Sequence, residues 1–278
     1  MHVTRGYHAL ALDFRLVIDD DELACYLEWL FDALPEPSSA AQYVVARSEV
    51  AEATYLQLSH NGEVVTRAPT ANEFVGALVR WLNQSAVEPD YGVTSHAGGI
   101  ERGGVACVLP ADPESGKTTL TTGLVRGGYA YLSDEAVSFD WDTGEIEPFP
   151  KPLSIDLGSQ HLFPELEPPA PCGESPSPTQ WQVPPSVIRP DAVGVRCRAR
   201  YVVFPRYVEG AATTLEPIAR AEGLVELAKN TFRFREHARR SLEALARVVR
   251  EVDCYRLAVG DLDDACALVD DLMTRALR

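Results

Sequence analysis

The chain has 278 residues, with 41 Asp or Glu against 25 Lys or Arg, and so carries a formal net charge of −16. This sign argues against nucleic acid or an anionic membrane as a partner, because both attract a basic face. No apolar run approaches the roughly 20 residues of a membrane span, and the N-terminus lacks the basic-then-apolar layout of a signal peptide. We therefore expect a cytoplasmic globular protein. Its six scattered cysteines form no CxxC pair, and we expect them to be buried free thiols.

The first ninety residues predict a small α+β domain without visible chemistry. Alternating apolar residues indicate strands, and Asn61-Gly62 is typical of a tight hairpin turn. Thr70 and Glu73 have the spacing of a capping box at the start of a helix. The elements expected here are strands at 10–18, 43–45, 54–58 and 63–65, and helices that begin near Asp21 and after Thr70.

The most informative stretch of the sequence follows at 105–119. Residues 105–109 are apolar and β-prone, as expected of a strand buried on both faces. The next eight residues, ADPESGKT, match GxxxxGK[ST] except that Ala111 replaces the first glycine. Residues 117–126 then predict a helix that ends at Gly127-Gly128. Strand, turn and helix come in the order that a phosphate-binding loop needs.

Such a loop holds phosphate with backbone N–H groups at the positive end of a helix. Lys117 would contact the β- and γ-phosphates, and the Thr118 hydroxyl would bind Mg²⁺. Gly116 leaves room for the phosphate, whereas the carboxylate of Glu114 must point outward or bind metal. We therefore expect ATP and Mg²⁺ as cofactors. The expected nucleotide contacts are Asp112, Pro113, Glu114, Ser115, Gly116, Lys117, Thr118 and Thr119.

Two acidic residues follow the next expected strand, at 129–132. Asp134 and Glu135 lie at its carboxyl end, where an open α/β sheet binds ligands. One carboxylate could bind Mg²⁺ together with Thr118, while the other accepts the proton of a substrate hydroxyl. Thr118, Glu135 and Asp134 are therefore the candidate metal ligands.

The remainder of the chain contains few chemical signals. Residues 162–192 are rich in Pro, Ser and Glu, which is typical of a mobile loop or of a segment that orders on substrate. The other expected elements are a hairpin at 136–149, strands at 201–204 and 254–259, a helix that begins at Pro217, a helix with Leu242 to Val249 on one face, and a closing helix from Leu262.

The spacing of the site residues carries a family resemblance. His96 lies 21 residues before Lys117, and Asp134 lies 17 residues after it. This arrangement resembles the HPr kinase/phosphorylase family, whose catalytic domain is similar to phosphoenolpyruvate carboxykinase, with the same GKTTL at its loop. The chain looks most like the HPr-kinase-related proteins of bacterial peptide-modification and other small gene clusters. The resemblance covers residues 91–278.

The resemblance implies an α/β fold, with an HPr-kinase/PEP-carboxykinase-like P-loop catalytic domain at 91–278 behind an N-terminal α+β domain at 1–90. It implies that Asp134 is the general base, that Glu135 is an acid near the metal or His96, and that His96 lies beside the transferring phosphate with Lys117. It also favours a homo-oligomer. Lys151 and Arg206 are candidates for further phosphate or substrate contacts, or are surface charges.

The sequence thus predicts a kinase that transfers the γ-phosphate of ATP to a hydroxyl, most simply a serine of a peptide or protein. A kinase for a small hydroxyl compound such as free serine fits the same site. A third alternative, favoured by Ala111 and Glu114, is a catalytically weak nucleotide-binding module that regulates or assembles a complex. The family's downstream Glu-Arg-Gly signature, tied to dephosphorylation, has no counterpart after Asp134. We therefore expect a forward kinase.

Overall fold

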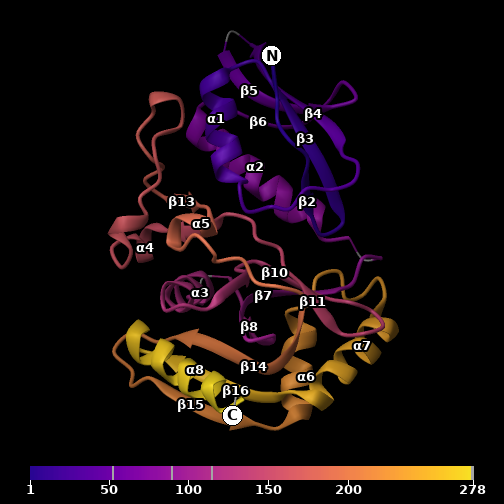
Figure 1. The fold of residues 1–278 in the computed structure, drawn as a ribbon, viewed down its shortest axis with the longest axis vertical. Helices are drawn as coiled ribbons and strands as arrows, with labels where there is room; N and C mark the ends of the chain where they lie inside the picture. Colours follow the sequence, from indigo (N-terminus) through magenta and orange to yellow (C-terminus); the bar gives the residue numbers. More distant parts are fainter. Residues whose placement is uncertain (52, 89, 114, 277–278) are drawn as a thin grey trace. The chain divides into compact units, whose positions relative to one another are not determined.

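The computed structural model describes residues 1–51, 53–88, 90–113 and 115–276. It mixes helices and strands and divides into two compact units, drawn in Figure 1. The first unit combines Met1–Ala86 with Lys151–Val187, and the second combines Val87–Pro150 with Ile188–Arg278. Every helix within the described ranges is too short or too polar to serve as a membrane span.

The first unit is built on a six-stranded sheet in the order β1-β3-β4-β5-β6, with β2 paired to β3. Among the described strands of this sheet, β3 and β4 are the one parallel pair, and α1 lies between them in the chain. Its core contains an aromatic cluster, in which the rings of Tyr7, Phe14 and Phe31 contact one another and Trp81 contacts Phe14. The elements are β1 (His2–Val3), β2 (Tyr7–Ala9), β3 (Leu12–Ile18), α1 (Asp21–Leu30), β4 (Ala41–Val50), β5 (Ala53–His60), β6 (Glu63–Ala68) and α2 (Ala71–Ala86).

Local sequence signals account for most of these boundaries. Asp20 caps α1 by accepting a hydrogen bond from the Leu23 N–H at 3.0 Å, and the Thr70 hydroxyl accepts from the Glu73 N–H at 3.2 Å. Asn61 and Gly62 both have positive φ, as the predicted hairpin turn requires. The strand predicted at 10–18 begins later, at Leu12, because residues 10–11 form the turn that folds β2 back on β3.

Residues 151–187 also belong to the first unit, which corrects the predicted domain at 91–278. The Glu174 carboxylate accepts hydrogen bonds from the N–H groups of Ala71 and Asn72, both at 2.9 Å, and so caps the first turn of α2. Residues 153–160 form β12 (Leu153–Asp156) and α4 (Leu157–Gln160). The segment predicted to be irregular, 162–192, carries short elements instead: the 3₁₀ turns at Pro164–Leu166 and Pro171–Gly173, β13 (Gln180–Val183), which pairs with β12, and α5 (Pro185–Ile188).

Removing this cap is expected to destabilise the first unit. Glu174→Ala should lower the free energy of unfolding by about 0.5–2 kcal/mol, because two N–H groups of α2 lose their acceptor and the helix dipole loses an anion. Urea unfolding followed by circular dichroism measures the change. Glu167→Ala, which removes an exposed carboxylate from the same segment, is the control and should change stability by less than about 0.5 kcal/mol. Equal losses in both variants would contradict the cap.

The second unit contains an eight-stranded mixed sheet in the order β11-β10-β7-β8-β14-β16-β15, with β9 also paired to β7. Strands β8, β14 and β16 are parallel, and the other pairings are antiparallel. Its elements are β7 (Val93–Arg102), β8 (Val105–Pro110), α3 (Lys117–Arg126), β9 (Ala130–Ser133), β10 (Ala136–Phe139), β11 (Glu145–Glu147), β14 (Cys197–Tyr207), β15 (Thr214–Ile218), α6 (Arg220–Lys229), α7 (Ala238–Glu251), β16 (Asp253–Val259) and α8 (Leu262–Ala276).

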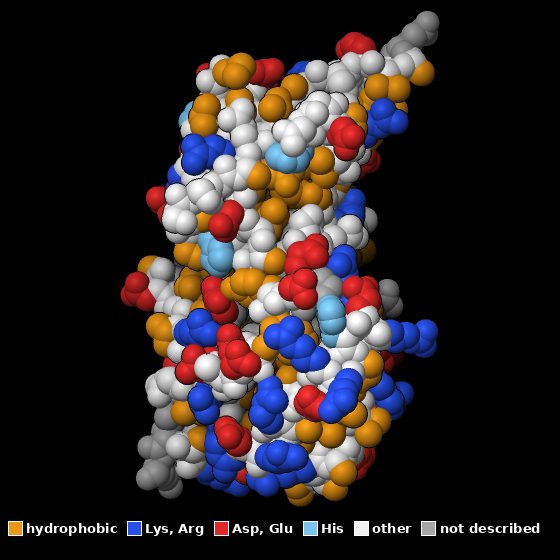
Figure 2. Space-filling view, turned by 90° about the vertical axis from the view of Figure 1, so that its right-hand side faces the viewer, with side chains coloured by type: hydrophobic (Ala, Val, Ile, Leu, Met, Phe, Trp, Pro, Cys, Tyr) orange, Lys and Arg blue, Asp and Glu red, His pale blue; other side chains and the backbone are white. Residues whose placement is uncertain are grey.

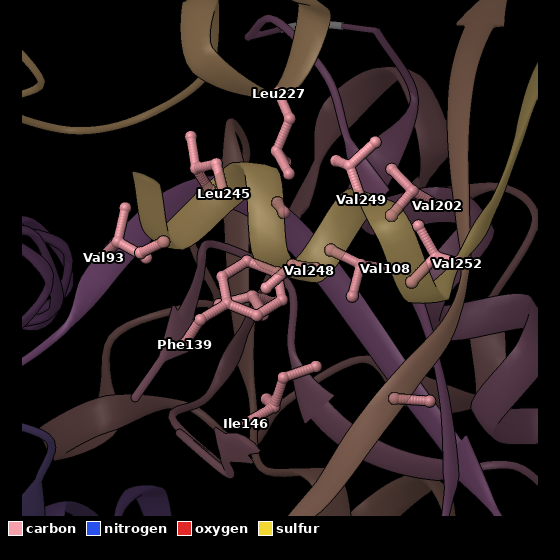
Figure 3. Close-up of a cluster of buried hydrophobic side chains, with 14 of the residues drawn as sticks. Val93, Val108, Phe139, Ile146, Val202, Leu227, Leu245, Val248, Val249 and Val252 are labelled. Atoms are coloured by element: carbon pink, nitrogen blue, oxygen red, sulfur yellow. The ribbon is translucent and has the colours of Figure 1, made fainter. Parts of the chain in front are cut away.

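The amphipathic helix α7 closes one face of this sheet. Figure 3 shows Leu245, Val248 and Val249 of α7 beside side chains of the strands, including Phe139 and Val202. Burial of such side chains away from water is the main stabilising contribution here. Elsewhere in the unit α3 packs closely against α8, since a Cβ at Gly123 would lie 2.9 Å from the Cys266 sulfur. The core thus fixes both the loop strand β8 and the helix that follows it.

One predicted boundary in this unit is wrong. Pro217 does not begin a helix; it lies in β15, and α6 begins three residues later, at Arg220. Strand β15 is at the edge of the sheet, where proline is tolerated because its missing N–H faces no neighbouring strand. All six cysteines are free, as predicted, but three of them are not buried: Cys25 is exposed, and Cys172 and Cys266 are half-buried. Among the buried ones, burial raises the pKa of Cys197 to about 12 and that of Cys254 to about 11.

The surface of the second unit mixes both signs of charge. Figure 2 shows Lys and Arg side chains interspersed with Asp and Glu over the face that carries α7. Arg239 pairs with Glu243 at 2.9 Å, and Arg196 pairs with both Asp140 and Glu145. Exposed pairs of this kind contribute little to stability. The face therefore offers paired charges rather than a single-sign field.

Candidate functional site

The loop at 111–116 joins the end of β8 directly to α3. Gly116 has φ +84°, a left-handed conformation that favours glycine, and its carbonyl accepts the hydrogen bond of the Leu120 N–H at 2.9 Å. In the described residues no side chain caps the N-terminus of α3, and no acid lies in its first turn. An anion at this helix end would therefore compete with no capping side chain among the described residues.

The loop residues differ in exposure. Asp112 and Pro113 are exposed, Ser115 and Thr119 are half-buried, and Glu114 lies outside the described residues. The Ser115 Oγ atom is buried and has no hydrogen-bond partner in the described part of the chain. A buried hydroxyl of this kind is costly unless something else bonds it. The loop residues that the structure describes thus fit a phosphate group, which would bond both the hydroxyl and the helix N–H groups.

Lys117 and His96 form the first contact between predicted site residues. Lys117 is only 6% exposed, and its Nζ lies 2.6 Å from His96 Nε2. An ammonium group only donates, so His96 Nε2 accepts and the ring proton lies on Nδ1. Glu135 adds a carboxylate 3.5 Å from the same ring nitrogen. The edge of the Phe232 ring packs against the imidazole, with 5.6 Å between ring centres.

Asp134 and Thr118 form the second contact. Asp134 is 1% exposed, and its Oδ2 atom accepts a hydrogen bond from the Thr118 hydroxyl at 3.1 Å. Its Oδ1 atom accepts from the buried Tyr131 hydroxyl at 2.7 Å. Burial, followed by the charge of Asp134, raises the pKa of Tyr131 well above its ordinary value. Tyr131 therefore stays protonated and donates to Asp134 throughout the physiological range.

Strand β7 explains why these residues meet. It pairs with β8, which leads into the loop, and with β9 and β10, which flank the acidic turn. His96 of β7 lies opposite Ala136 of β10. The Ser133 hydroxyl accepts from the N–H groups of Glu135 and Ala136 and so fixes the turn between β9 and β10. One strand thus holds the loop and the acidic pair at the same edge of the sheet.

The metal ligands can be assessed from their donor atoms. In the described ranges no group of three or more His, Cys, Asp and Glu side chains is arranged to hold a metal ion. Thr118, Asp134 and Glu135 offer oxygen atoms beside the loop. Mg²⁺ is usually bound by one or two carboxylates together with substrate phosphates and water. This donor set therefore fits Mg²⁺ in company with a phosphorylated ligand rather than alone.

The two further candidates lie elsewhere in the chain. Lys151 is fully buried in the first unit, and its ammonium donates to the Pro152 carbonyl at 2.7 Å, so it is not a surface charge. Arg206 is exposed in β14, next to Tyr207. The first unit also contains a cavity of about 930 Å³ beside α2, and none of the predicted site residues lines it.

Three residues at the site escaped the sequence analysis. They are Tyr131, which the sequence places only in a strand, Phe232, and Tyr207, whose N–H donates to the Ser115 carbonyl at 3.2 Å. Tyr131 has a sequence signal, because it carries a hydroxyl and lies three residues before Asp134. Phe232 has none, because it is distant from His96 in the sequence and only the fold brings the two rings together. No protein-family model and no curated protein matches the chain. The family resemblance accordingly stays a prediction.

Proposed function

We propose that this chain is an ATP- and Mg²⁺-dependent kinase that phosphorylates a hydroxyl group, in the simplest case a serine of a peptide or protein. The observation that carries the proposal is the 3.1 Å contact between Thr118 in the first turn of α3 and the buried Asp134 carboxylate. Phosphoryl transfer needs a phosphate cradle and a base near the acceptor, and this contact brings the two together.

Each side chain has a defined task in this scheme. The loop N–H groups, Lys117 and Thr118 bind the phosphates, and bound Mg²⁺ would neutralise the charge that develops on them. The acceptor oxygen bonds to the γ-phosphorus as the bond from that phosphorus to the ADP oxygen breaks. Asp134 takes the hydroxyl proton at Oδ2, whose hydrogen bond from Thr118 is longer, at 3.1 Å, than the 2.7 Å bond that Oδ1 accepts from Tyr131.

His96 and Glu135 act on Lys117 in this scheme. His96 Nε2 accepts from the Lys117 ammonium at 2.6 Å, which orients that ammonium at the start of α3. Glu135 places a negative charge beside the pair. A charged group held by such partners loses little conformational freedom when it binds an anion, and this preorganisation supports transition-state stabilisation.

Two alternatives use the same residues. A small hydroxyl compound such as free serine could replace the peptide, because nothing in the catalytic contacts depends on the acceptor's size. The nucleotide-binding module was favoured by Ala111 in place of glycine. Ala111 is not among the described residues with positive φ, so its side chain imposes no left-handed strain on the loop. This observation supports the enzyme over the module.

Transfer from γ-labelled ATP tests the proposal. The full chain is incubated with Mg²⁺ and a panel of serine-containing peptides, proteins encoded nearby and free serine. We expect label on one acceptor class, which would also separate the peptide kinase from the small-molecule kinase. Binding of ATP without transfer or hydrolysis would favour the module instead.

Tyr131→Phe is expected to lower kcat about tenfold or more while leaving the KM for ATP nearly unchanged. The variant leaves Oδ1 of a buried Asp134 without its donor, which disturbs the base but not the loop. Tyr129→Phe is a matched control, because Tyr129 is equally buried and donates to Asp270 at 2.8 Å. Steady-state kinetics of both variants measure the effect, and equal kcat losses would argue against a role for Tyr131 in the site.

A further inference from the structure

Tyr207 is unusual among the aromatic residues of this chain. The chain has 23 Phe, Trp and Tyr residues, all within the described ranges, and Tyr207 is the one classed as exposed, with 54% of its surface accessible. Its phenol has no hydrogen-bond partner in the described part of the chain. Aromatic side chains contribute most when their ring faces are covered. The exposed ring therefore calls for an explanation outside the protein's own packing.

The position of Tyr207 supplies one. It is the last residue of β14, which runs parallel to the loop strand β8, so the carboxyl ends of both strands lie at the same edge of the sheet. The Tyr207 N–H donates to the Ser115 carbonyl at 3.2 Å. A Cβ on Gly116 would lie 3.6 Å from the Tyr207 Cβ. The backbone and Cβ of Tyr207 thus lie directly against the loop.

Ring and loop together define a ligand with two chemically different ends. The loop fits phosphate, through helix N–H groups and the orphaned Ser115 hydroxyl. The flat apolar face of Tyr207 is accessible and fits another π system. A nucleotide joins phosphates to a flat base through a sugar. We propose that Tyr207 is the stacking platform for the nucleotide base, an inference that rests on the nucleotide binding in the proposed function.

The test compares two ligands that differ in having a nucleoside. Binding of Mg·ATP and of Mg·tripolyphosphate to the full chain is measured by calorimetry for wild type, Tyr207→Ala, Tyr207→Phe and Val208→Ala. Tyr207→Ala removes the stacking of the base on an aromatic ring, and ATP binding should therefore weaken about 5- to 150-fold. Its tripolyphosphate affinity should stay within about twofold of wild type, since the loop backbone is intact.

The other variants serve as controls. Tyr207→Phe keeps the ring and should bind ATP nearly as wild type does, and Val208→Ala should do the same. Tripolyphosphate binding by Tyr207→Ala would also show that the loop remains folded. Unchanged ATP affinity in Tyr207→Ala, or equal losses for both ligands, would overturn the stacking role.

The same data separate this inference from the proposed function. If wild type binds neither ligand, both the phosphate-binding role of the loop and the stacking role of Tyr207 are wrong. If Tyr207→Ala loses ATP affinity alone while wild type transfers no phosphate to any acceptor, the base platform stands and the kinase proposal fails.

Discussion

Asp134→Asn is expected to lower the rate of phosphoryl transfer about 10²- to 10⁴-fold, the contribution typical of a general base. The asparagine side chain has the same shape, and its oxygen can still accept from Tyr131. Its amide nitrogen then faces Thr118, where the carboxylate Oδ2 lies in the native protein. An amide cannot take up the hydroxyl proton. Transfer from γ-labelled ATP gives the rate, and calorimetry should show that ATP still binds.

The chain offers a matched control for this variant. Asp270 also accepts from a tyrosine hydroxyl, that of Tyr129, and from Arg102, but it lies on α8 and has no part in the scheme. Asp270→Asn should leave the transfer rate unchanged. Full turnover by Asp134→Asn would remove Asp134 from the mechanism, whatever the fate of the rest of the site.

Lys117→Met is expected to weaken Mg·ATP binding by about 1–3 kcal/mol, or roughly 5- to 150-fold, the scale of a charge-assisted hydrogen bond. Methionine keeps most of the buried volume of the lysine stem, so the variant removes the ammonium group without opening a cavity. The loss should appear for tripolyphosphate as well, because the ammonium group contacts phosphate and not the base. Calorimetry with both ligands measures it.

Lys229→Met provides the comparison. Lys229 is exposed on α6, where its ammonium contacts Glu226 at 2.9 Å, and its removal should not change ligand affinity. If Lys117→Met binds Mg·ATP as tightly as wild type, the loop is not a phosphate site, and the kinase proposal loses its foundation.

Short-range patterns predicted much of the second unit. Helix α3 has the predicted bounds, 117–126, because a glycine with positive φ precedes it and two glycines follow it. Strands β8 and β9 were visible as apolar runs. The acidic pair and the loop meet as expected, because each follows a strand that ends at the same edge of the sheet.

The parts that the sequence did not show depend on contacts between distant residues. Pro217 is typical of a helix start by itself, and only its place in an edge strand makes it a strand residue. Nothing local in 162–192 indicates that Glu174 caps a helix one hundred residues earlier. Tyr207 lies beyond the strand predicted at 201–204, and only the longer β14 and its pairing with β8 bring it beside Ser115. Such features follow from tertiary topology and not from periodicity.

The Glu174 cap also bears on the order in which the chain folds during synthesis. Helix α2 is complete at Ala86, but its capping residue Glu174 is translated 88 residues later, after β8 and after Asp134 and Glu135. At a translation rate of about 5–20 residues per second, α2 lacks its Glu174 cap for roughly 4–18 s and has Thr70 as its side-chain cap during that time. The first unit therefore closes after much of the second has emerged, so the two folding processes overlap in time instead of running one after the other.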